Sequence, residues 1–193
     1  MGRSGDPRKR NPAAPPPPTS GGDAVITIVS GRDPRVPASC LLSWQGHDWA
    51  AGVDRVRATA VDLVTAAAWA ELMMLLVVKT RLPVATVSAM SGDLLGRSGR
   101  TELGNQATVM LTPLGSSATR TPLVLLRRGP LQGLLPTGEA RQMGLDWLAA
   151  AEAAESDRAV TQALRVVGEL PEPRIEALFD YLRDLRSRPG EDL

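Results

Sequence analysis

Two alanine-rich stretches decide the fold of this chain: VRATAVDLVTAAAWAE at residues 56–71 and ARQMGLDWLAAAEAAE at residues 140–155. Each has the apolar spacing of a helix with one buried face. A shift of 84 positions aligns identical residues, namely Arg57 with Arg141, Asp62 with Asp146, Ala66 with Ala150, Ala67 with Ala151, Ala70 with Ala154 and Glu71 with Glu155. Similarity at a fixed spacing indicates a repeated structural unit. The two stretches therefore predict an internal duplication with one long helix in each half. We also expect a repeated structural pairing of Arg57 and Arg141 with acids of the repeat, which are Asp62, Glu71, Asp146 and Glu155.

The segments around these helices follow the same order in both halves. In the first half we expect strands at 24–30 and 39–44, a loop or short third strand at 45–52, and helices at 54–80 (capped by Asp54) and 83–95. In the second half we expect strands at 107–112, 122–128 and 132–135 and helices at 137–167 and 172–187. The sequence thus predicts an α+β fold. Each half is a β-hairpin followed by a helix pair, and the hairpins join in one antiparallel sheet with the helices packed on it.

Composition divides the 193 residues into a tail, one domain and a short end. Residues 1–22 are basic and contain four consecutive prolines, which favour polyproline II and disorder. Residues 23–188 are long enough to bury one core, with the repeats at about 24–97 and 107–187. We expect residues 189–193 to be a flexible C-terminus.

The first long helix contains an apolar run at residues 63–78, interrupted only by Glu71. The run is shorter than the roughly 20 residues needed to cross a bilayer. Asp62 and Glu71 would also cost a few kcal/mol each inside a membrane. We therefore expect a buried central helix and no membrane span.

The supply of reactive side chains is poor. Cys40 and His47 are the only residues of their kinds, so a zinc site of the usual composition and an internal disulfide are both excluded. Ser43, His47 and Asp48 are the residue types of a hydrolytic triad, but the nucleophile-elbow pattern is missing. The glycine-rich segment 96–100 follows a helix, whereas phosphate-binding loops precede one. We expect no catalytic residue, cofactor or metal, and a hydrolase using His47 is the weakest of three functional interpretations.

Charge is distributed unevenly, although the net charge is only +1. Residues 97–128 carry a net charge of +4 and residues 129–193 a net charge of −5. Phosphate backbones attract such basic segments. An alternative function is therefore a nucleic-acid-associated regulatory protein that uses segment 97–128 and the tail. The candidate contacts are Arg97, Arg100, Arg127 and Arg128, although the last two are adjacent on a strand and point to opposite faces.

The favoured interpretation is a non-enzymatic interaction or accessory protein that docks to a protein partner. The acidic C-terminal third, with an amphipathic helix at 172–187, and the proline-rich tail are compatible with docking. A single cysteine fits a reducing compartment, and no apolar run follows the basic N-terminal residues. We therefore expect a cytoplasmic protein.

Overall fold

The computed structural model describes residues 25–30, 37–97, 103–104, 109–167 and 170–187. The first half contains β1 (Thr27–Ser30), β2 (Ser39–Trp44), β3 (His47–Gly52), α1 (Val53–Thr80) and α2 (Val84–Arg97). The second half contains β4 (Leu103–Gly104), β5 (Met110–Gly115), β6 (Pro122–Arg128), β7 (Leu131–Pro136), α3 (Thr137–Val167) and α4 (Glu172–Ser187). The predicted α+β class is confirmed. The predicted tail at 1–22 and the C-terminal residues 189–193 lie outside the described residues.

Both predicted third strands are present, and each runs directly into a long helix. β3 ends at Gly52, which is also the N-cap of α1, so Asp54 lies in the first turn and the prediction that it caps the helix is wrong. β7 ends at Pro136, immediately before α3 begins at Thr137. Each long helix is therefore attached to its sheet without a linker.

The strands form two antiparallel sheets, so the prediction of a single sheet is wrong. The first sheet has the order β1-β2-β3 and the second β4-β5-β6-β7. The sheets meet through side chains: the guanidinium carbon of Arg128 on β6 lies 3.9 Å from the ring centre of Trp49 on β3. Because each third strand turns at once into a helix, each half completes its own small sheet.

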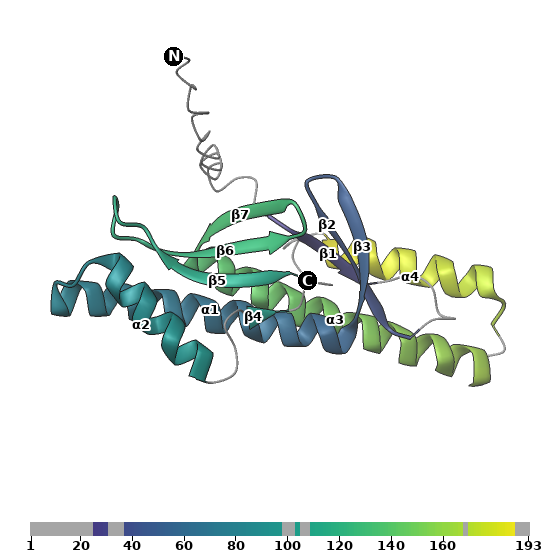
Figure 1. The fold of residues 1–193 in the computed structure, drawn as a ribbon. Coiled ribbons are helices and arrows are strands. Elements are labelled where there is room, and N and C mark those ends of the chain that lie inside the picture. The colour runs from purple at the N-terminus through teal and green to yellow at the C-terminus, as the bar shows by residue number, and fades with distance from the viewer. Residues whose placement is uncertain (1–24, 31–36, 98–102, 105–108, 168–169, 188–193) are drawn as a thin grey trace, which may run out of the picture.

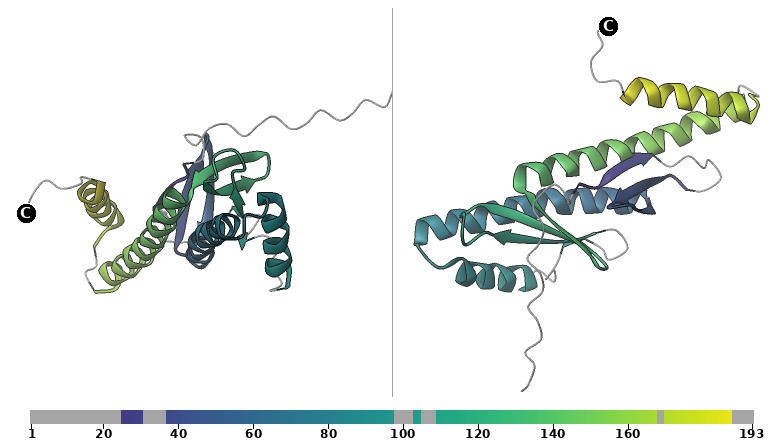
Figure 2. Two further views of the ribbon diagram at one scale, coloured as in Figure 1. Left: turned by 90° about the vertical axis from the view of Figure 1, so that its left-hand side faces the viewer. Right: turned by 90° about the horizontal axis from the view of Figure 1, so that it is seen from above.

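The two long helices lie side by side on one side of both sheets (Figures 1 and 2). α1 packs chiefly against α3 and against β5 and β6 of the second half. α3 in turn packs against β1 and β2 of the first half. Each long helix thus supports the sheet of the other half, and the halves share one core.

Small residues bring α1 and α3 close together. Ala60, Ala66, Ala67 and Ala151 are fully buried between larger neighbours. A Cβ atom added to Gly144 of α3 would lie 2.9 Å from the carbonyl oxygen of Ala60. Alanine and glycine are therefore needed at this crossing because larger side chains would separate the helices.

The 84-residue spacing reappears in the coordinates. β3 shifted by 84 positions coincides with β7, and the first residue of α1 with the first residue of α3. The β2–β3 pairing of Ser39 with Gly52 becomes the β6–β7 pairing of Leu123 with Pro136. β1 falls within β5, with its pairing register moved by one residue. The two halves therefore have the same order of elements and nearly the same strand pairing.

α1 is the helix, among the described residues, that is long and apolar enough to cross a membrane by length and composition. Its packing against α3 and both sheets confirms the predicted central position. Its burial is incomplete, however, because Leu72, Leu75, Leu76 and Val78 near its C-terminal end are exposed. The expectation of a fully buried helix is therefore wrong for its last turns.

Candidate interaction surface

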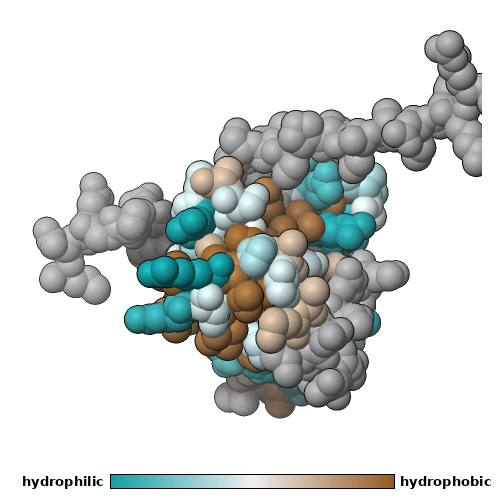
Figure 3. Space-filling view, turned by 60° about the vertical axis from the view of Figure 1, so that its left-hand side comes forward, coloured by the Kyte–Doolittle hydropathy of each residue, from teal (hydrophilic) through white to brown (hydrophobic). Residues whose placement is uncertain are grey.

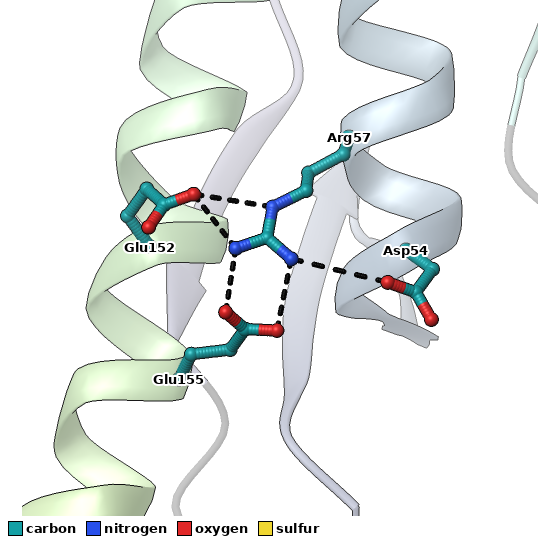
Figure 4. Close-up of polar contacts among 4 residues, drawn as sticks. All are labelled: Asp54, Arg57, Glu152 and Glu155. Atoms are coloured by element: carbon teal, nitrogen blue, oxygen red, sulfur yellow. Dashed lines mark hydrogen bonds and ion pairs between the residues drawn. The ribbon is translucent and has the colours of Figure 1, made fainter.

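Two arginine–carboxylate clusters join the long helices. Arg57 of α1 donates hydrogen bonds to Glu152 Oε1 at 2.7 Å and to the two carboxylate oxygens of Glu155 at 2.8 and 2.6 Å (Figure 4). Oδ1 of Asp54 lies 3.9 Å from Nη1 of Arg57. Arg141 of α3 donates to both carboxylate oxygens of Glu71 on α1. The prediction that repeated arginines pair with repeated acids is confirmed for Glu71 and Glu155.

The two clusters are counterparts of each other. Arg57 corresponds to Arg141, and Glu155 corresponds to Glu71, at the same offset of 84. Exchanging the halves therefore converts one ion pair into the other, which is the pattern of a contact around a twofold axis. Because Arg57 pairs with the later residue of α3 and Glu71 with the earlier one, α1 and α3 run antiparallel, and Gly144 lies close to the backbone of Ala60.

The same clusters predict a dependence of stability on pH. The guanidinium groups of Arg141 and Arg57 lower the pKa values of Glu71 and Glu155 below the ordinary 4.5, chiefly through hydrogen bonds. The contribution to stability is present above that ordinary value and is lost as pH falls through the lowered pKa values of the folded state. We expect the urea midpoint to fall less on acidification in an Arg57→Met/Arg141→Met variant than in the wild type. An equal fall in both proteins would contradict this linkage.

The four arginines proposed for nucleic-acid binding have different surroundings. Arg127 is exposed, whereas Arg128 is partly buried and lies over Trp49, as expected for neighbours on opposite faces of a strand. Arg97 is the last residue of α2, and Arg100 lies outside the described residues. Arg128 thus has a role in holding the sheets together, and nucleic-acid binding stays a prediction.

His47 lies at the start of β3, next to the tight turn at Gln45 and Gly46, which both have positive φ. It is exposed and pairs with Trp44, whereas Ser43 pairs with Asp48. Adjacent residues on a strand point to opposite faces. The register therefore separates His47 from Ser43 and Asp48 and does not assemble a triad.

An open cleft of about 670 Å³ lies between the first turn of α1 and the middle of α3. Its charged lining includes Asp54, Arg55, Glu155 and Arg158. Glu155 is already engaged by Arg57. Acids and bases alternate around this cleft, so it has no preference for one sign of charge.

A second surface was not expected from the sequence. Six large apolar side chains at the end of α1, in the connection to α2 and on α2 are between 39% and 58% exposed, and we call them the apolar end: Leu72, Leu75, Leu76, Val78, Leu82 and Met90. Figure 3 shows hydrophobic surface gathered on this face of the molecule, with hydrophilic side chains at its edge. The neighbouring residues Met73, Met74 and Val77 are buried against Val87 of α2. One side of this helix segment is therefore buried by packing, and the other side is exposed to solvent.

The charges near the apolar end are positive. Lys79 and Arg81 are exposed at the end of α1, where Arg81 forms the left-handed C-cap. Arg120 is exposed on the β5–β6 turn. This turn follows Gly115, which lies against Met74 and Val84. The sequence contains no acidic residue between 72 and 90. Between residues 72 and 90 the charged side chains are therefore both basic, and the next acid along α2 is Asp93.

Three of the four counterpart positions on α3 carry small or polar side chains, and the fourth carries a valine. Shifting Leu72, Leu75, Leu76 and Val78 by 84 positions gives Ser156, Ala159, Val160 and Gln162. These positions are exposed as well. The fold thus tolerates small and polar residues at such positions, and packing does not explain why the first half carries three leucines there.

No protein-family model matches this chain, and neither the curated proteins nor the solved structures contain a match to it.

Proposed function

We propose that this chain is a non-enzymatic docking protein of the cytoplasm and that it docks through the apolar end. The exposure of six large apolar side chains in one place carries the proposal. Burying such a side chain completely is worth about 1.5–3 kcal/mol, so covering this surface would provide substantial binding free energy. Contiguous exposed apolar patches on soluble proteins commonly mark interaction sites.

The ionic groups that the fold brings together support docking rather than catalysis. Arg57 and Arg141 are held in ion pairs that connect α1 to α3, and Arg128 connects the two sheets. These contacts hold the two halves of the molecule together. The sequence favours a protein partner, whereas the charges around the apolar end, considered below, favour a lipid surface at this site.

We further propose that the two halves arose by duplication of one β-meander–helix unit. The matching β2–β3 and β6–β7 registers support this origin. The reciprocal ion pairs of Arg57 and Arg141 support it as well. After duplication, the end of α1 acquired leucines where α3 has Ser156 and Ala159, so one half specialised in docking while both kept the core.

Site-specific photo-crosslinking in the native host tests the docking proposal. We expect a crosslinkable residue at position 75 to give an adduct, either with a protein or with a lipid, and the same residue at the counterpart position 159 to give none. Introducing Leu72→Asp should remove the adduct while the circular dichroism spectrum stays unchanged, because Leu72 is exposed. Equal labelling at both positions, or an adduct unaffected by Leu72→Asp, would refute docking through the apolar end.

A further inference from the structure

We infer that the apolar end binds the surface of an anionic lipid bilayer. The inference rests on the proposed function, because it names the partner of the same site. It concerns association with the membrane surface, and α1 remains within the fold.

The charges around the apolar end select the partner. Lys79, Arg81 and Arg120 supply positive charge, and residues 72–90 include no acid. The nearest preceding acid, Glu71, is paired with Arg141, and the nearest following acid, Asp93, lies three residues beyond Met90 on α2. The partner must therefore be apolar at its centre and negative at its rim, as an anionic bilayer is, with acyl chains beneath a layer of phosphates.

Two other partners fit these charges less well. A second copy docked around a twofold axis would place Lys79 and Arg81 near their own counterparts, and like charges oppose such a contact. A nucleic acid offers phosphates, but its backbone has no apolar surface to cover Leu75 and Val78, which are 52% and 58% exposed. Neither alternative satisfies both the charge and the apolar area.

The position of the apolar end suits contact with a flat surface. It lies where α1 ends and α2 begins, at one extremity of the elongated molecule (Figure 1). Earlier parts of α1 are covered by α3 and the second sheet, so only the end of the α1–α2 hairpin projects. Aliphatic side chains at such a tip can enter the headgroup region, while long basic side chains reach the phosphates.

Vesicle flotation with the full-length protein tests the inference. We expect binding to vesicles of phosphatidylcholine containing about one third phosphatidylglycerol, and at least about tenfold weaker binding to phosphatidylcholine alone. Lys79→Ala and Arg81→Ala should each weaken binding about fivefold, corresponding to about 1 kcal/mol per basic residue at an anionic surface. High salt should weaken binding by the wild type.

A pair of matched variants separates insertion of the apolar end from general attraction. Leu75→Asp/Val78→Asp should reduce binding about tenfold or more, whereas Ala159→Asp/Gln162→Asp should leave it nearly unchanged. Both variants add two negative charges at exposed counterpart positions. Equal losses in the two variants, or no binding of the wild type to anionic vesicles, would overturn the inference.

The crosslinking experiment separates the two proposals. A defined protein adduct at position 75 without vesicle binding would overturn the bilayer inference and leave docking in place. The absence of both the adduct and vesicle binding would contradict docking through the apolar end.

Discussion

Replacing Gly144 with valine is expected to lower the free energy of unfolding by about 3 kcal/mol. The position lies where α1 and α3 approach each other most closely. A Cβ atom there would sit 2.9 Å from the Ala60 carbonyl oxygen and 3.0 Å from Val64 Cγ2. Backbone atoms cannot move aside as the end of a flexible side chain can, so a branched residue must separate the helices. Urea denaturation followed by circular dichroism measures the loss.

Gly138, in the first turn of the same helix, is the matched control. A Cβ atom there meets nothing within 4 Å, and the residue does not have a positive φ. Gly138→Ala should therefore stabilise the protein by about 0.4–1 kcal/mol, because alanine restricts the unfolded chain. If Gly144→Val were as well tolerated as Gly138→Ala, this result would contradict the close approach of α1 and α3 at Gly144.

The order of helices and strands could be predicted because local sequence patterns indicate each element. The alanine-rich stretches at 56–71 and 140–155 have helical periodicity, and their identical spacing relates the two halves. The same alignment indicated that Arg57 and Arg141 would face acids of the repeat. Pairing residues around a twofold axis needs only the repeat, so this part of the candidate site followed from the sequence.

The number of sheets and the apolar end could not be predicted in the same way. The two sheets meet through the side chains of Trp49 and Arg128, which are 79 positions apart in the chain, and no local pattern specifies such a contact. Residues 72–78 are apolar all round the helix, so periodicity does not distinguish the side that packs from the side that stays open. The packed side is set by α2, which covers Met73 and Val77, and by β5, where Gly115 lies against Met74.

Replacing Trp49 with alanine should destabilise the protein by about 3–5 kcal/mol, because the ring is a large buried part of the core that also joins the two sheets. The ring is 9% exposed and has the Arg128 guanidinium against its face. Among the described residues, neither Arg128 Nε nor Trp49 Nε1 has a hydrogen-bond partner, although both are buried. Without the ring, Arg128 would face a cavity with its charge poorly compensated.

Trp49→Phe separates the aromatic face from the rest of the side chain. It keeps a π surface beneath Arg128 and removes the buried N–H group that lacks a partner, so we expect a loss of only about 1–2 kcal/mol. Arg128→Met should cost less in the Trp49→Ala background than in the wild type, because the contact is already absent there. Thermal and urea unfolding of the wild type, Trp49→Ala, Arg128→Met and the double variant measure this coupling. Additive losses would mean that Arg128 and Trp49 act independently and that another contact holds the two sheets together.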